Sequence, residues 1–151
     1  MSVSVQEADF DSGREAAQLV AGRSDVGAVA TFVGLVRGDG REDAVSAMTL
    51  EHYPGMTEKA LEDILAQARQ RWPAVTGARV IHRVGRLAVG DQIVFVGVAS
   101  GHRGDAFAAC EFIMDYLKTR APFWKKEERP SGASWVDARD SDDDAAARWS
   151  T

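Results

Sequence analysis

The sequence predicts an α+β fold, a two-layer domain with a mainly antiparallel sheet and packed helices. The segment 27–37 is almost continuously apolar and β-branched, which is typical of a buried strand. Segments 78–87 and 92–100 have the composition of two strands joined by a tight turn. Segments 57–72 and 105–120 carry apolar residues at helical spacing. Strand pairs that alternate with helices indicate an α+β domain.

The first third of the chain predicts strands around one short helix. Residues 3–5 alternate as in a short strand, and residues 12–20 form the helix. The buried strand 27–37 follows, and the polar segment 38–43 makes a turn or mobile loop. Because segment 45–52 alternates again, we expect strands 27–37 and 45–52 to form a hairpin.

The middle of the chain predicts a helix and a strand pair. Thr57 is the expected N-cap of a helix that Pro73 stops. Two strands follow, joined at residues 90–91. The helix should bury one stripe of apolar side chains, which consists of Ala60, Leu61, Ile64, Leu65, Ala68 and Trp72.

The last third predicts a long helix over about residues 105–120, since Pro122 forbids its continuation. Residues 135–136 add a short strand. The acidic run 140–144 belongs to a solvated tail. We therefore expect residues 1–151 to be a single domain with an acidic C-terminal tail over about 140–151.

Composition excludes several classes of protein. The chain of 151 residues has a net charge of −5 and a pI near 5.2, which argues against a duplex nucleic-acid binder. One cysteine excludes an internal disulfide, and the three scattered histidines argue against a zinc site. The N-terminus lacks the features of a signal peptide, and no apolar run reaches the roughly 18 residues of a membrane span. We expect a cytoplasmic protein.

The stretch 116–130 is locally cationic in this acidic chain. By Lys126 it holds four cations among three aromatic residues, a combination that favours a flat anionic ligand. Lys118 closes a helix with an apolar stripe, and an ammonium beside apolar surface loses hydration and becomes a usable acid or base. Alternatively, Lys118 extends past the helix end into water. The stripe consists of Phe107, Cys110, Met114 and Leu117, and Cys110 is expected to be a buried structural thiol.

Three further sites offer anion-binding groups. His102 and Arg103 lie where a buried strand meets a helix N-terminus, a junction that suits a phosphate. Arg37 ends an apolar strand and presents a planar fork for phosphate or carboxylate, and Arg139 is similar but weaker. For each of them, a solvated charge without a ligand is the alternative.

Several motifs together resemble the MoaE family, the large and catalytic subunit of molybdopterin synthase. The resemblance covers about residues 26–139 and departs at Leu35 and in the loop 38–43. The longest match runs over residues 112–125 and is the most specific. The other matches are Phe32-Val33-Gly34 with Val36-Arg37, Leu50 to Met56, Ile81 to Gly85, Gly90-Asp91 with Ile93 to Val96, and His102-Arg103.

The resemblance implies a hammerhead-like α+β fold and a defined reaction. Sulfur passes from the C-terminal Gly-Gly thiocarboxylate of a small ubiquitin-like subunit, of the MoaD type, to cyclic pyranopterin monophosphate. The product is the dithiolene of molybdopterin. The implied assembly is a dimer of large subunits with a small subunit at each end, and neither a cofactor nor a metal is implied.

The resemblance also implies roles for individual residues. Lys118 and Lys125 would be the catalytic pair. Paired lysines can protonate a departing oxygen and stabilise a tetrahedral adduct. The implied substrate-binding residues are Leu35, Val36, Arg37, His102, Arg103, Lys126 and Glu127, with the backbone contributing at Leu35, Val36 and Glu127. Arg139 joins them as the weaker candidate that the residues themselves suggest.

Two other functions remain open from the residues alone. A non-catalytic module that binds the tail of a ubiquitin-like protein would explain a basic pocket. A lyase that forms a Schiff base through Lys118 would also use a poorly hydrated lysine. The first would yield no dithiolene, and the second would form an adduct that borohydride traps.

Overall fold

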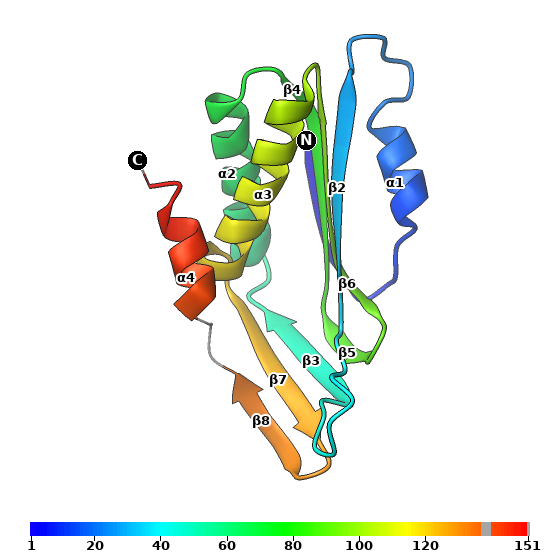
Figure 1. Ribbon diagram of the computed structural model, residues 1–151, viewed down its shortest axis with the longest axis vertical. Helices are drawn as coiled ribbons and strands as arrows, with labels where there is room; N and C mark the ends of the chain where they lie inside the picture. Colours follow the sequence, from blue (N-terminus) through cyan, green and yellow to red (C-terminus); the bar gives the residue numbers. More distant parts are fainter. Residues whose placement is uncertain (137–139, 151) are drawn as a thin grey trace.

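The computed structural model describes residues 1–136 and 140–150, with the backbone alone at residues 140 and 141. In this part of the chain the strands form two four-stranded sheets, accompanied by four helices. The α+β prediction is confirmed, although the strands divide between two sheets. Figure 1 shows an elongated molecule with a helix-covered sheet at one end and the second sheet at the other.

The first sheet, sheet A, carries helices on both faces. Its strand order is β1-β4-β6-β2, with β1 parallel to β4 and the other pairs antiparallel. Helix α1 (Ser12–Gln18) contacts β2 and β6, and the helices α2 (Met56–Arg71) and α3 (Arg103–Arg120) lie on the other face (Figure 1). The strands are β1 (Ser2–Gln6), β2 (Ala28–Leu35), β4 (Val75–Arg83) and β6 (Gln92–Ser100).

The second sheet, sheet B, is antiparallel throughout, in the order β5-β3-β7-β8. Its β3 lies in a different sheet from β2, so the predicted hairpin is wrong. Val36 explains why the chain leaves sheet A after β2. Its side chain is buried against sheet B, and its N–H donates to Asp91 O at 2.9 Å. The strands are β3 (Ala47–His52), β5 (Gly85–Ala88), β7 (Phe123–Arg129) and β8 (Gly132–Val136).

The predicted strand 78–87 is divided between the two sheets. Strand β4 ends at Arg83, and β5 begins at Gly85, whose φ is +86°. Residues other than glycine rarely adopt this left-handed backbone conformation. Glycine therefore allows the chain to leave sheet A here. Apolar periodicity does not reveal such a break.

Two clusters of buried side chains hold the elements together. The larger one lies between sheet A and α2, α3 and α4 (Asp140–Ala147), and the smaller one lies in sheet B. Ile93 packs against both clusters and so connects the two sheets. Of the predicted α2 stripe, Leu61, Ile64, Leu65 and Ala68 are buried.

Several local predictions are corrected. The N-cap of α2 is Gly55, not Thr57, and α3 begins at Arg103. Phe107 is 66% exposed and does not belong to the buried stripe. Strand β7 was not predicted, because its Lys and Glu residues hide the strand pattern.

The expected solvated tail is instead largely helical. Helix α4 spans Asp140–Ala147, and Ala146 is buried against the main core. After it, the Trp149 ring packs edge-on against Trp72 at 5.6 Å, and its Nε1 donates to Asp115 at 2.7 Å. The C-terminal segment is therefore anchored by buried apolar surface as well as by hydrogen bonds.

We predict that Gly85→Ala destabilises the fold by about 1–2 kcal/mol, because alanine must adopt positive φ at the junction of the sheets. Gly77→Ala is the matched control, since its added Cβ would meet only Leu19 Cδ2, at an ordinary 3.7 Å. Urea unfolding of both variants measures the difference. Equal stability of the two variants would contradict a strained junction.

Candidate active site

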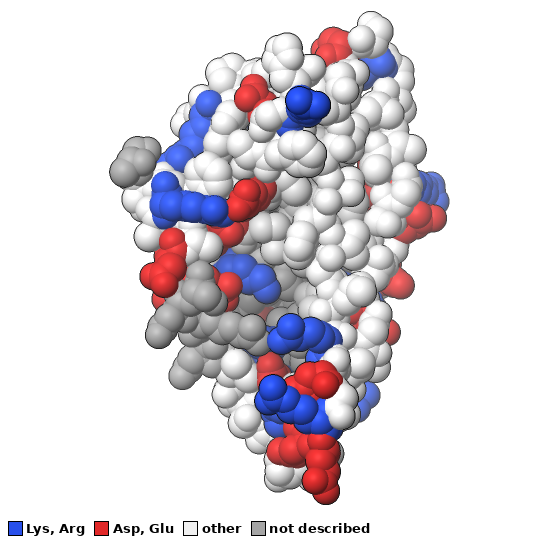
Figure 2. All heavy atoms as spheres, viewed as in Figure 1, with Lys and Arg blue, Asp and Glu red and all other residues white. Residues whose placement is uncertain are grey.

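A cleft of 730 Å³ separates the C-terminal end of α3 from sheet B. Its walls come from the end of β2 and the loop after it, from β3, from β4 and β6 of sheet A, from α3 and from β7. In the space-filling view, the surface is hollowed between the helices and sheet B, and Lys and Arg side chains lie there beside Asp and Glu side chains (Figure 2). The cleft thus lies where the two sheets meet.

Strand β7 supplies the floor of the cleft through its two-residue period. Phe123, Lys125, Glu127 and Arg129 alternate along the strand and all line the cleft. Lys126 falls on the opposite face, where its Nζ lies 6.0 Å from the centre of the Trp135 ring. The structure therefore does not place Lys126 in this cleft, contrary to the expectation from the sequence.

Thr57 fixes the junction between α3 and β7. Its buried hydroxyl accepts from Tyr53 N and donates to Pro122 O, both at 2.9 Å. Pro122 separates the helix that carries Lys118 from the strand that carries Lys125. Thr57 is therefore not a helix cap, and its side chain instead holds the two lysine-bearing elements together.

Charges of both signs meet in the cleft. Glu127 is buried, and its carboxylate contacts Lys125 Nζ at 3.4 Å and Arg129 Nη2 at 2.9 Å. This arrangement fixes the Lys125 ammonium near the floor. Among the residues that the structure describes, the lining holds four cations and three carboxylates, a formal excess of one positive charge in a chain of net charge −5. They are Arg37, Lys118, Lys125 and Arg129 against Asp39, Glu127 and Asp142.

Lys118 lines the cleft from the last turn of α3, with Leu117 and Ala121 beside it. Its side chain is exposed in this single chain, so the predicted burial beside apolar surface is wrong for the chain alone. The predicted stripe does place Leu117 and Met114 in the core, which leaves the next position, Lys118, at the opening. Lys118 and Lys125 therefore converge on one cleft from different elements.

His82 is a cleft residue that the sequence did not single out. It lies in β4, is only 6% exposed, and stacks on Phe123 with ring centroids 3.9 Å apart. Burial lowers the pKa of His82 to about 4, and the positive charge of Lys118 also contributes. One signal was present: a histidine that directly follows Val80 and Ile81 in a predicted strand has a polar ring close to the core.

Other predicted residues lie elsewhere. His102 and Arg103 are exposed at the N-terminus of α3, about 22 Å from Lys118 at the rise of an α-helix. Leu35 and Arg37 do line the cleft, but Val36 is buried in sheet B with both backbone groups engaged in the turn at residues 90–91. The prediction for Arg139 falls outside the described residues.

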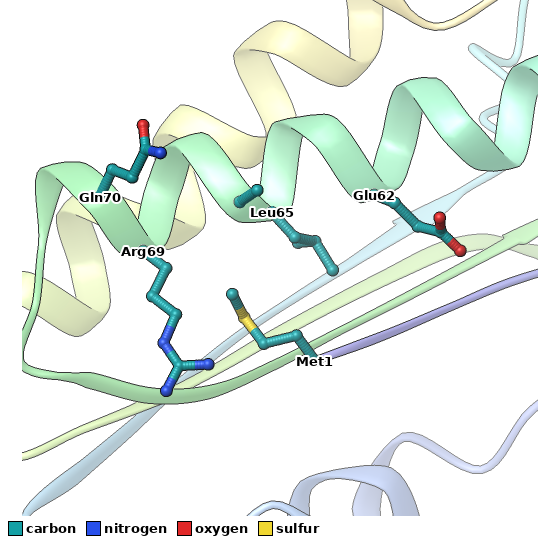
Figure 3. A pocket seen from close by; sticks show the side chains of 6 residues that line it. Met1, Glu62, Leu65, Arg69 and Gln70 are labelled. Atoms are coloured by element: carbon teal, nitrogen blue, oxygen red, sulfur yellow. The ribbon is translucent and has the colours of Figure 1, made fainter.

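A second hollow lies between the N-terminus and α2. Figure 3 shows Met1 reaching toward Leu65 while Arg69 and Glu62 point to the same side of the helix. The polar groups there do not converge on one point, unlike those of the cleft. This hollow is a weaker candidate for a catalytic site.

Three properties of the described residues bear on other functions. No group of three or more His, Cys, Asp or Glu side chains among them could hold a metal ion. None of the described helices has both the length and the apolar character needed to cross a bilayer. Burial raises the pKa of the Cys110 thiol to about 11, and the prediction of a buried structural thiol is confirmed.

Comparisons with known proteins agree on one family. The family model described as MoaE protein matches residues 5–120. A molybdopterin synthase catalytic subunit from Ralstonia nicotianae is 64% identical over 98% of this chain and 84% of its own length. A molybdopterin biosynthesis MoaE protein from Burkholderia ambifaria is 57% identical, with a TM-score of 0.84 over 99% of this chain and 98% of that one.

A more distant structure shares the fold. It is a protein–protein complex of subunits 1 and 2 of the molybdopterin-converting factor from Helicobacter pylori. The matched chain is 21% identical, with a TM-score of 0.74, and each chain is covered over 91% of its length. The fold is therefore retained at low sequence identity.

The lowered pKa of His82 predicts a loss of stability in mild acid. The unfolded histidine takes up a proton near pH 6.5, whereas the folded one does so only near pH 4. Stability contributed by the neutral ring is complete above pH 6.5 and falls as the pH drops toward 4. Urea titrations should show a loss of about 1 kcal/mol from this group between pH 7.5 and 5.5, and His82→Phe should remove it. A variant with the same pH dependence as the wild type would contradict this assignment.

Proposed function

The chain belongs to the MoaE protein family and acts as a molybdopterin synthase catalytic subunit, and from this premise we propose that Lys118 and Lys125 are its catalytic pair. The reaction moves sulfur from the C-terminal thiocarboxylate of a small subunit to cyclic pyranopterin monophosphate, which forms the dithiolene of molybdopterin. One observation carries the assignment of the pair: both lysines line the same cleft although they come from α3 and β7.

The two lysines have different surroundings, which suggests different roles. Lys125 is held by the buried Glu127 carboxylate at 3.4 Å, so its charge is fixed in position to stabilise a developing oxyanion. Lys118 lies at the exposed end of α3, where it can meet the incoming tail and donate a proton to the departing oxygen. Glu127 is thus a positioning residue for Lys125 as well as part of the substrate site.

The cations at the cleft suit a phosphate and a thiocarboxylate. Arg37 offers a planar fork at the exposed side, where Leu35 supplies apolar surface for a flat ring. Both anionic groups would enter a region that has a positive excess in a negatively charged protein. We further propose that residues 1–151 act as one domain, because residues from Phe32 to Asp142 line the cleft.

We propose that the partner is the small ubiquitin-like subunit, whose C-terminal Gly-Gly tail enters this cleft. An extended glycine tail is narrow enough to reach buried groups, and its terminal anion is attracted by the lysines. The single, buried cysteine is compatible with a reducing compartment, and we place the reaction in the cytoplasm.

We also propose that the large subunits pair, and that His102 and Arg103 serve the cleft of a second copy. Within one chain they are about 22 Å from Lys118. The edge strand β2 leaves Val29, Phe32 and Leu35 exposed, and Phe32 and Leu35 also line the cleft. A second copy against this edge would cover that apolar surface and bring new side chains to the cleft.

Lys118→Ala should reduce dithiolene formation by at least about 1,000-fold, because both the proton donor and the tail anchor are lost. Lys125→Ala should reduce it by about 100-fold or more. The assay mixes the chain with thiocarboxylated small subunit and pterin precursor, and follows molybdopterin. Lys59→Ala, an exposed lysine outside the cleft, is the control. Near-normal turnover of a folded Lys118→Ala variant would refute its role.

Mixed dimers test whether two copies share one site. Arg103→Ala and Lys118→Ala homodimers should both be impaired. Mixing them should restore activity, because a mixed dimer has one cleft with Lys118 from one copy and Arg103 from the other. Up to about one quarter of the wild-type activity is expected from equal amounts, since half of the dimers are mixed and each has one intact site. Mixtures that stay inactive would place Arg103 in the cleft of its own copy, and an Arg103→Ala homodimer of full activity would place it outside the reaction.

A further inference from the structure

His82 connects the two lysine-bearing elements. Its ring lies flat against Phe123, with planes 20° apart, and Phe123 precedes Lys125 by two residues in β7. The ring also lines the cleft into which Lys118 projects from α3. A buried side chain thus contacts the strand of one proposed catalytic lysine and shares a wall with the other.

The tautomer of His82 follows from one hydrogen bond. Its Nδ1 lies 2.9 Å from the carbonyl oxygen of Arg83, and a carbonyl can only accept. Nδ1 therefore carries the ring hydrogen in the neutral imidazole, and Nε2 keeps its lone pair. The ring, which lines the cleft, therefore has a hydrogen-bond acceptor at Nε2.

The surroundings keep this ring neutral. Burial is the largest effect that lowers the pKa of His82, the hydrogen bond to Arg83 opposes it, and the charges of Lys118 and His52 add to the lowering. At neutral pH the ring is therefore an acceptor rather than a cation or an acid. In the part of the chain that the structure describes, the ionisable groups nearby or in the same cleft are Lys118 of α3, His52 of β3, Lys125, Glu127 and Arg129 of β7, Arg37 and Asp39 after β2, and Asp142 of α4.

A lysine at the opening of a cleft acts as a directed proton donor when fixed acceptors orient its ammonium. The four-carbon stem and rotating ammonium of Lys118 lose conformational entropy when they adopt one geometry. A fixed partner with a lone pair reduces that cost at the moment of reaction. Glu127 does this for Lys125 through its carboxylate.

We propose that His82 is a positioning residue for Lys118, whose ammonium donates one hydrogen bond to His82 Nε2 and directs its other N–H groups at the substrate. The inference rests on the proposed role of Lys118 as proton donor. His82 itself neither gives nor takes a proton in the reaction. A neutral acceptor suits this task, because a protonated ring would repel the ammonium and a carboxylate would compete with the anionic substrate.

Two substitutions separate the acceptor from the shape of the ring. His82→Phe keeps the stack on Phe123 and removes both nitrogens, whereas His82→Gln retains an acceptor oxygen near the position of Nε2. We expect His82→Phe to lower kcat by about 10- to 100-fold with KM within about threefold. The high-pH limb of its kcat profile should move to lower pH, because the ammonium loses an acceptor that favours its charged form. His82→Gln should recover most of kcat and restore the high-pH limb of the profile to its wild-type position.

Val80→Ala is the matched control for stability. Val80 is fully buried in the same strand, two residues from His82, and does not line the cleft. This variant should lower Tm but leave kcat and the pH profile unchanged. A wild-type kcat and profile for His82→Phe would overturn the proposal. So would equal impairment of the Phe and Gln variants, since that would indicate a role in shape alone.

A measurement without turnover keeps the inference distinct from the proposed function. In ¹⁵N NMR spectra of the wild-type chain, Nε2 of His82 should show the shift of an unprotonated nitrogen that accepts a hydrogen bond. Lys118→Ala should move this resonance toward that of a free acceptor and raise the pKa of His82. An unchanged resonance and pKa would overturn the contact even in an active enzyme. Failure of the wild-type chain to form dithiolene would instead refute the proposed function.

Discussion

The site depends on how strand β7 leaves helix α3. Pro122 ends the helix, and the strand that follows alternates its side chains between two faces, so that Lys125, Glu127 and Arg129 all point to one cleft. The buried hydroxyl of Thr57 ties this junction to the start of α2. A shift of one residue in the register of β7 against β3 would turn Lys125 away and present Lys126 instead.

In the cleft, one carboxylate is paired with two cations, so it offsets only part of their positive charge. Glu127 is shared between Lys125 and Arg129, so one buried carboxylate orders two positive side chains and leaves a positive excess. Breaking such a partly buried arrangement leaves a charge without its partner, which is costly in a region of low dielectric. His82 occupies an adjacent buried position without adding a third charge. The cleft can therefore attract anions without forcing its own cations apart.

Much of the fold could be predicted from the sequence where local patterns and tertiary structure agree. Strand β6 matches the expected segment 92–100, and the core positions of α2 follow from helical spacing. The hairpin between segments 27–37 and 45–52 could not be excluded locally, because only the burial of Val36 against sheet B separates the strands. Strand β7 was hidden because its alternation is between two charged faces rather than between apolar and polar ones.

The site was predictable to the extent that its residues stand on matching motifs. Lys118, Lys125, Arg37, Leu35 and Glu127 line one cleft, as the resemblance implied. His102 and Arg103 also stand in matching motifs but lie at the other end of α3, because a match in sequence does not show which positions lie close together in space. His82 was missed because its importance comes from its neighbours, Phe123 above all.

The four tryptophans divide into two optical environments. Trp72 and Trp149 pack edge-on in the helical layer, whereas Trp124 and Trp135 are exposed on the outer side of sheet B. We therefore expect the intrinsic fluorescence of this chain to contain a blue-shifted component from the helical end and a red-shifted, quenchable component from the sheet end. Selective quenching by acrylamide separates events at the two ends of the molecule without an attached dye.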